Sequence, residues 1–401
     1  MSDALFDQLR AQFQLPDSKI YLDGNSLGAL PRATPPTITD TVKKQWGEDL
    51  IDSWNTHDWI DLPLAVGNQI SKLIGAVEDS VVCCDNLSIN LYKAILAALE
   101  LNPTRTSMCV EKQQFPSDNY IAAGVSRLLG NDRCSITALS IADMTSEQLS
   151  DVAVLVLSHV DYKTGSLRDM AQITKNAHAA GALVIWDLAH SAGVVDIDLT
   201  ACEVDFAVGC TYKFLNGGPG APGYLYVAPK HQSASNAIPG WMGHAAMFDF
   251  EPSYRPAQGI RRFLTGTQSV LALSAVSAGL KIFDAVPISD LRARSLLLTR
   301  QFMDLLDESS VASATSVITP RSDDERGSQV SVSLEHAFPI SQALIDSGVV
   351  VDFRAPNIIR FGFSPLYNTP AEAVAAVKAL EDIVREKRYE DPKYNVKHKV
   401  T

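Results

Sequence analysis

Short runs that are apolar throughout recur between residues 80 and 210, and they alternate with longer segments in which apolar residues have the spacing of a helix. The clearest runs are 153–157 and 182–186, with a helical pattern over 170–180 between them, and a third run, 205–210, is apolar after Asp205. A strand without polar positions must be covered on both faces, as in a parallel sheet flanked by helices. The fold class predicted is therefore α/β with a mainly parallel central sheet, whose ligands bind at the carboxyl ends of the strands.

The pattern changes beyond residue 270, where longer helical segments enclose two apolar runs. Helices are predicted over 270–285, 290–306, 340–347 and 370–386, and strands over 329–334 and 358–361. These elements predict a smaller α/β domain at the C-terminal end. The expected division is an N-terminal arm with helices (1–60), a large domain (61–270) and a small domain (271–401).

Charge and composition exclude several classes of partner. The chain has 401 residues, 46 of them acidic and 34 basic (Lys and Arg), which gives a formal net charge of −12. It has no basic stripe, so a nucleic-acid partner is not expected. No apolar stretch is long enough to span a membrane and the first residues do not resemble a signal peptide, so we expect a cytoplasmic protein without membrane contact. The six cysteines have no C-x-x-C spacing, so neither a metal site nor a disulfide framework is predicted.

Lys213 has an unusual setting for a lysine. It follows the apolar run 205–210, and three glycines come soon after it, at 217, 218 and 220. An amine in such a place can be desolvated, and desolvation lowers the pKa of a lysine towards the range in which its nucleophilic form exists. Schiff-base chemistry requires that form. The alternative is a solvated loop lysine beside a tight turn.

Asp187 stands at the tip of the run 182–186, 26 residues before Lys213. It could simply cap the next helix. The combination of the two residues is more specific, because pyridoxal phosphate needs a lysine for its aldehyde and a carboxylate that keeps its pyridine nitrogen protonated.

Residues 24–28 match the G-x-S-x-G pattern of a hydrolase nucleophile elbow around Ser26. An elbow requires a strand that runs directly into a helix, whereas Pro31, Pro35 and Pro36 follow here. A serine hydrolase is therefore disfavoured, and the two glycines are expected to let the backbone approach another segment closely.

Together with further motifs, these residues make the chain resemble the kynureninase family. Its members are fold-type I pyridoxal-phosphate enzymes of the class V aminotransferase group. The motifs that carry the resemblance cover nearly the whole chain, at residues 21–28, 46–47, 53–55, 115–118, 159–165, 186–193, 211–216, 240–244, 266–268, 356–362 and 365–368. The resemblance implies hydrolysis of the Cβ–Cγ bond of L-kynurenine to anthranilate and L-alanine, in tryptophan catabolism. It also implies action on 3-hydroxykynurenine and a homodimer.

The resemblance assigns catalytic roles to three residues. Lys213 resembles the lysine that binds pyridoxal phosphate and moves the substrate Cα proton, and Asp187 the partner of the pyridine nitrogen. Tyr212 is expected either to shuttle a proton or to contact the cofactor phosphate, or to do both. Phe115 resembles the aromatic residue that stacks on the cofactor ring, although a phenylalanine in this place could equally be packed in the core.

Further cofactor contacts are implied at Leu87, Ser88, Asp118, Ser158, His190, Trp241 and Thr267. Two of these positions depart from the family pattern. Leu87 stands where related enzymes have threonine, so a backbone N–H would have to replace the hydroxyl. Thr267 stands where other members have asparagine, and its contact is expected across a subunit boundary.

The substrate is expected to contact Arg360, Asn25 and Ser26. Arg360 resembles the fork for the α-carboxylate, a bidentate task that suits a guanidinium, and Arg354 is the alternative. A cysteine desulfurase or selenocysteine lyase is the rival function. Those enzymes use a cysteine in the C-terminal half, and this sequence has none after Cys210.

Overall fold

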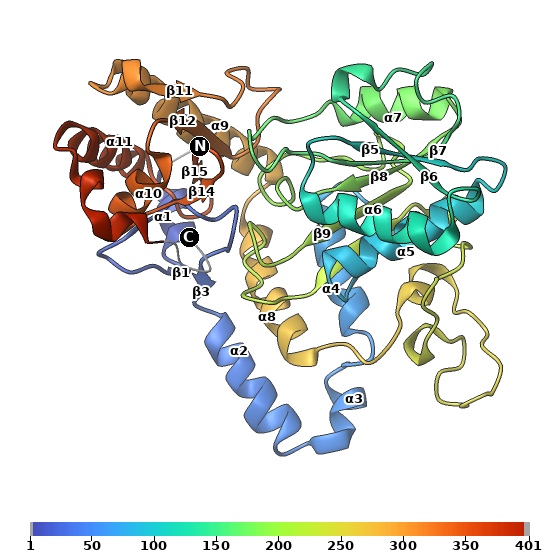
Figure 1. The fold of residues 1–401 in the computed structure, drawn as a ribbon. Coiled ribbons are helices and arrows are strands. Elements are labelled where there is room, and N and C mark those ends of the chain that lie inside the picture. The colour runs from blue at the N-terminus through green and yellow to red at the C-terminus, as the bar shows by residue number, and fades with distance from the viewer. Residues whose placement is uncertain (1–2, 397–401) are drawn as a thin grey trace.

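The computed structural model describes residues 3–396 and contains two bodies that lie side by side (Figure 1). The larger body is built around a seven-stranded sheet with the order β4-β10-β9-β8-β7-β5-β6. Its strands are Val81–Cys84 (β4), Ser107–Glu111 (β5), Ser135–Leu139 (β6), Val152–Ser158 (β7), Leu183–Asp187 (β8), Phe206–Cys210 (β9) and Gly223–Val227 (β10). Strand β10 runs opposite to the other six strands, so the predicted mainly parallel sheet is confirmed.

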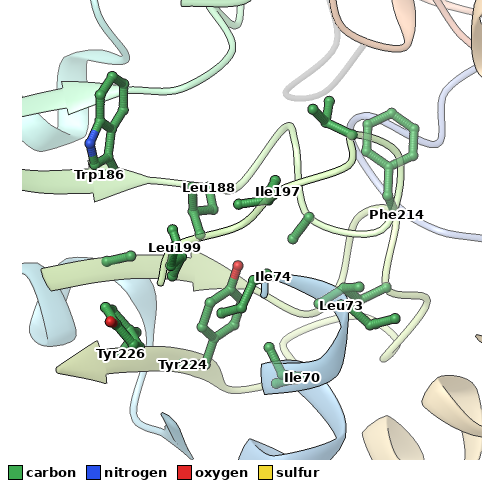
Figure 2. Packing of buried hydrophobic residues seen from close by; sticks show 14 of the residues in the cluster. Ile70, Leu73, Ile74, Trp186, Leu188, Ile197, Leu199, Phe214, Tyr224 and Tyr226 are labelled. Carbon is green, nitrogen blue, oxygen red and sulfur yellow. The ribbon is translucent and has the colours of Figure 1, made fainter. Parts of the chain in front are cut away.

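Alternate side chains of each strand enter two different cores, as a sheet covered on both faces requires. On β8, Val184 and Trp186 enter one core and Ile185 the other. The first core is closed by α4 (Leu62–Leu73), α7 (Met170–Ala179) and α8 (Val270–Leu280), and the second by α5 (Leu87–Leu101) and α6 (Pro116–Leu129). Figure 2 shows part of the first core, with Tyr224 of β10 beside Ile70 of α4.

The smaller body is built around an antiparallel four-stranded sheet with the order β11-β12-β15-β14. Its elements are Thr315–Val317 (β11), Gln329–Leu334 (β12), Asp352–Arg354 (β14), Ile358–Gly362 (β15), Ile288–Glu308 (α9), Ala337–Asp346 (α10) and Pro370–Arg385 (α11). A capping box between Thr369 and Glu372 begins α11. The three helices and two strands expected here beyond residue 285 are all present, with ends that differ by at most three residues.

The N-terminal residues belong partly to this smaller body. Strand β2 (Ile20–Tyr21) pairs with β13 (Val349–Val350), and Leu22 lies in the same core as α9 and α11. The chain also forms α1 (Asp3–Arg10), β1 (Phe13–Gln14) and β3 (Leu30–Pro31), and then α2 (Thr34–Asp40), a π-helical turn (Thr41–Trp46) and α3 (Ser53–Thr56). Figure 1 shows α2 and α3 projecting from the molecule. The division of the chain at residues 60 and 270 stays a prediction.

Within residues 3–396, no single helix is both long and apolar enough to cross a membrane. One bent pair, Val270–Ala285 and Ile288–Glu308, meets the length and composition criteria together, with an angle of 87° between its halves.

Candidate active site

The carboxyl ends of β4, β5, β7, β8 and β9 meet at one edge of the large sheet, because these strands run in the same direction. A cavity of about 190 Å³ lies at this edge. The following predicted residues line it: Leu87, Ser88, Phe115, Ser158, Asp187, His190, Tyr212 and Lys213.

Lys213 lies in the turn after β9 and reaches into the cavity. Its Nζ is 2.8 Å from His190 Nε2 and 5.8 Å from the centre of the Phe115 ring. The turn is covered by the loop at residues 24–28, where the Gly28 N–H donates to the Tyr212 carbonyl at 2.8 Å. A Cβ on Gly28 would lie 2.3 Å from the Lys213 carbonyl oxygen, so only glycine allows this approach. This contact explains the second glycine of the G-x-S-x-G match. A nucleophile elbow would require a helix directly after Ser26, whereas the next helix is α2, which begins at Thr34.

Asp187, the last residue of β8, lies in the cavity wall beside a second buried carboxyl group, that of Asp118. Burial raises the pKa of Asp187, although Lys213, the Ala189 N–H at 2.8 Å and Asp118 act in the opposite direction. Burial and the charge of Asp187 raise the pKa of Asp118 well above its ordinary value. Two carboxylates this close cannot both ionise freely. The pKa of Asp118 is raised more strongly than that of Asp187, so Asp118 is the first of the two to hold a proton.

Two further titratable groups beside Lys213, His190 and Tyr212, are held neutral. Burial and the nearby charge of Lys213 lower the pKa of His190 well below its ordinary value. The neighbouring Cys210 thiol and burial raise the pKa of Tyr212, so its hydroxyl keeps its proton. His190 is thus available as a neutral hydrogen-bonding group, and Tyr212 as a proton donor.

The start of α5 forms the end of the cavity that can accept an anion. Asn86 caps the helix through its side chain, which accepts from the Ile89 N–H at 3.0 Å. The first N–H groups of a helix have no partner within it, and Leu87 and Ser88 are the first two residues here. Ser88 Oγ lies 3.1 Å from Ser117 Oγ, which adds two hydroxyls to the site. Because Leu87 presents its backbone at this point, its lack of a hydroxyl does not remove the anion site.

Arg360 and Ser26 lie together, but Arg360 already binds another carboxylate. Arg360 is 1% exposed, and its Nε donates to Asp352 Oδ1 at 2.6 Å while its Nη2 contacts Asp352 Oδ2. Ser26 Oγ donates to Asp352 at 2.7 Å and accepts from Arg360 Nη2 at 3.2 Å. Burial alone would raise the pKa of Asp352, but the hydrogen bonds and charge of Arg360 lower it.

Arg354 also binds Asp352, whereas the Asn25 side chain lies against Gly362, where a Cβ would come within 1.8 Å of Asn25 Oδ1. Arg354 Nη2 lies 2.9 Å from Asp352, and its side chain is 31% exposed. Asn25 is fully buried, and neither its amide nitrogen nor its amide oxygen has a hydrogen-bond partner among residues 3–396. A buried amide without partners points to a group that the protein alone does not supply.

Three predicted cofactor residues, Asp118, Thr267 and Trp241, do not line the cavity of Lys213. Thr267 lines a separate cavity of about 290 Å³, together with Asp85 and Gln268. Trp241 is 36% exposed, and its ring packs edge-on against Phe248 at 6.0 Å.

Sequence reasoning missed several residues that the structure brings to the site. Tyr162 lines the cavity and packs edge-on against Phe115, with ring centres 5.2 Å apart, and Ser117 lines it as well. Both lie within motifs that carried the family resemblance. Asp352 and Gln329 come from the smaller sheet, and no local pattern marks them, because their contacts are made between distant segments.

The donor set fits pyridoxal phosphate. The helix start and two serine hydroxyls suit a phosphate, Phe115 offers a flat apolar surface, and Asp187 and Lys213 suit a pyridine nitrogen and an aldehyde. Asp118 places a second buried carboxyl group beside Asp187. Among residues 3–396, no group of three or more His, Cys, Asp or Glu side chains is arranged to hold a metal ion.

Comparison with known proteins gives the same family as the motifs. Residues 291–380 match the model of the kynureninase C-terminal domain. The chain is 42% identical over 398 residues to the kynureninases of Pseudomonas fluorescens and Burkholderia mallei, which covers 98% of this chain and 96% of each relative.

Solved structures share the fold at much lower identity. The cysteine desulfurase of Thermococcus onnurineus is 18% identical with a TM-score of 0.79, and the match covers 95% of this chain and 98% of that one. The cysteine desulfurase of Escherichia coli is 19% identical with a TM-score of 0.77, with 95% and 98% covered. These structures confirm the predicted fold, whereas the close relatives show the family. The chain belongs to the kynureninase family.

Proposed function

We propose that this chain binds pyridoxal phosphate and hydrolyses the Cβ–Cγ bond of L-kynurenine to anthranilate and L-alanine. The observation that carries the proposal is the convergence of Lys213, Asp187 and the start of α5 on one cavity, in a member of the kynureninase family. 3-Hydroxykynurenine, which would give 3-hydroxyanthranilate, is proposed as a second substrate.

When bound, pyridoxal phosphate supplies an electron sink that stabilises negative charge on the carbon atoms of the amino acid. The carboxylate of Asp187 would hold the ring nitrogen in its protonated form, and a proton on Asp118 would support the negative charge of Asp187. Phe115 would hold the ring, and Leu87, Ser88 and Ser158, which line the same cavity, would bind the polar groups of the cofactor.

Two neighbouring residues handle protons. The Lys213 amine moves the proton of the substrate Cα, for which its position beside the neutral His190 suits it. Tyr212 keeps its phenolic proton, so it can protonate the carbon that is left after cleavage. A contact between Tyr212 and the cofactor phosphate is compatible with that role.

The α-carboxylate of the substrate is proposed to bind at the cluster around Asp352, where two arginines meet. Arg360 is the proposed ligand, supported by Asn25 and Ser26, and Arg354 is the alternative because more of its side chain is exposed. Arg360→Lys should raise KM more than it lowers kcat, and Arg354→Lys tests the alternative in the same assay.

A homodimer is proposed because large apolar side chains lie exposed on two segments of the surface. They are Trp46, Leu50, Ile51, Phe248 and Phe250, each more than half exposed. A second copy that covers them would also supply Trp241 and Thr267 to the site, which accounts for their place outside the cavity of their own chain. The cytoplasmic location stays a prediction.

The proposal is tested by adding pyridoxal phosphate to the purified chain and following anthranilate formation from L-kynurenine. The protein should gain a visible absorbance band and turn over both substrates, and kcat/KM for each gives the preference. Lys213→Ala should lose the band and the turnover, whereas Lys72→Ala, at an exposed lysine of α4, should keep both. Turnover by Lys213→Ala, or inactivity of the wild type on both substrates, would overturn the proposal.

A further inference from the structure

Gln329 reaches the active site from the smaller sheet. It is the first residue of β12, is 1% exposed, and lies against the imidazole of His190. Gly165, with a φ of +76°, makes room for it, because a Cβ there would lie 2.9 Å from Gln329 Cγ.

The orientation of the Gln329 amide is fixed by its neighbours. Its nitrogen donates to the Tyr162 carbonyl at 3.0 Å and to Ser331 Oγ at 3.2 Å. A carbonyl oxygen only accepts, so a flipped amide would set two acceptors against each other. The Gln329 Oε1 atom must therefore face the other way, where it is buried without a hydrogen-bond partner in residues 3–396.

His190 has a complementary unpaired atom. Its Nδ1 is buried and lacks a hydrogen-bond partner in the same part of the chain, whereas its Nε2 lies 2.8 Å from Lys213 Nζ. A neutral imidazole has one donor and one acceptor nitrogen, and the partner of one nitrogen decides the role of the other. A protonated lysine only donates, and Gln329 Oε1 only accepts, so both neighbours favour the same tautomer.

We propose that Gln329 is a positioning residue that holds His190 in the Nδ1–H tautomer, so that the Nε2 lone pair faces Lys213 and the cavity. The Nδ1–H group donates to Gln329 Oε1 after a small shift of either side chain. Once the Lys213 amine is engaged with the cofactor, Gln329 is the group that maintains the tautomer. The inference builds on the proposed function only in treating the Lys213 cavity as the active site.

The tautomer can be measured directly by NMR on protein with ¹⁵N-labelled histidine, with and without pyridoxal phosphate. His190→Gln identifies the signals of His190. The wild type should show the Nδ1–H pattern in both forms. Gln329→Met, which removes the acceptor at nearly constant volume, should lose that pattern with pyridoxal phosphate bound. Gln329→Glu should instead raise the pH at which His190 becomes doubly protonated, because a carboxylate favours the imidazolium.

Gln232→Leu is the matched control. Like the Gln329 amide, the Gln232 amide donates to two acceptors, the carbonyls of Asp79 and Val227, but it lies at the amino end of the sheet, opposite the Lys213 cavity. It should leave the His190 signals unchanged. The kcat of Gln329→Met should fall by on the order of 10–100-fold, by analogy with the loss of partners that orient metal-binding histidines.

An Nε2–H pattern in the wild type would overturn the inference without any variant. An unchanged Nδ1–H pattern in Gln329→Met with pyridoxal phosphate bound would also overturn it. Because the spectra do not depend on turnover, inactivity towards kynurenine with the expected spectra would count against the proposed function alone.

Discussion

Two buried aspartates on neighbouring strands have opposite surroundings. Asp187 ends β8 and Asp205 directly precedes β9, so they lie at opposite edges of the sheet. Asp187 has one main-chain donor, the Ala189 N–H, and otherwise faces Asp118 and Lys213. The carboxylate of Asp205 has four donors, which are His178 Nε2 at 2.7 Å, His231 Nε2 at 2.8 Å, Lys230 Nζ at 3.0 Å and the Val184 N–H at 3.0 Å.

The difference decides the sign of each pKa shift. Burial alone would raise the pKa of both carboxyl groups, but the hydrogen bonds from His178 and His231 lower that of Asp205, whereas that of Asp187 stays raised. A saturated buried carboxylate stabilises the fold. A buried carboxylate with too few hydrogen-bond donors destabilises the fold, and such groups occur at functional sites, where a ligand can supply the missing partner.

The largest effect is expected for Asp187→Asn, which removes the charge at constant size. A buried carboxylate that sets the protonation state of a catalytic ring is worth on the order of 10⁴-fold in serine proteases, so kcat should fall by on the order of 10³–10⁴-fold. The thermal stability of the cofactor-free protein should stay the same or rise, because a costly charge is removed. A variant that is clearly less stable without cofactor would contradict the contrast with Asp205.

The reverse result is expected for Asp205→Ala. Removing one partner from a buried ionic cluster costs about 3–5 kcal/mol, because the remaining donors stay desolvated. Urea unfolding should show this loss, whereas kcat per folded molecule should change less than about twofold, since Asp205 lies at the edge of the sheet away from the cavity. Asp205→Asn, which keeps an acceptor oxygen, is the control and should lose less. A large fall in kcat with unchanged stability would refute the structural role.

Asp187 could be predicted as a site residue from the sequence, whereas the role of Asp205 could not. Asp187 follows a wholly apolar run, which marks a strand tip at the ligand-binding edge. Nothing local marks Asp205, because the histidines that saturate it come from α7 and from the turn after β10. The fold was predictable for the same reason as Asp187, since apolar periodicity is a local signal.

Contacts between distant segments were not predictable. The Asp352 carboxylate that binds Arg360 and the Gln329 amide beside His190 both come from the smaller sheet, whose placement follows from tertiary packing. Strands β6 and β10 were also not predicted. Strand β10 runs antiparallel because no crossover helix separates it from β9.

The pH dependence of stability should separate the two aspartates. The folded pKa of Asp205 is lowered, so its contribution is present above the unfolded pKa of about 3.9 and is lost as pH falls through the folded value. The stability difference between wild type and Asp205→Asn should therefore be constant above about pH 5 and shrink below about pH 4.

Asp187→Asn should show the opposite trend, because the folded pKa of Asp187 is raised. Its penalty is absent below about pH 4 and develops as pH rises through the folded value. Unfolding curves of the cofactor-free proteins from pH 3 to pH 8 measure both differences. If the stability differences of Asp187→Asn and Asp205→Asn changed with pH in the same direction, the two aspartates would not differ in the sign of their pKa shifts.

The smallest effect is expected at Asp118, the neighbour that distinguishes the surroundings of Asp187 from those of Asp205. Its raised pKa keeps a proton on the carboxyl group, and that proton can be donated to Asp187. Asp118→Asn keeps a donor, so kcat/KM should fall less than about tenfold and the acid limb of its pH profile should not move. Asp118→Leu removes the donor, so the pKa of Asp187 should rise and the acid limb should move to higher pH. An equal displacement of the acid limb in both variants would show that Asp118 acts through its charge. In that case the donor that completes the hydrogen bonding of Asp187 would have to belong to the ligand.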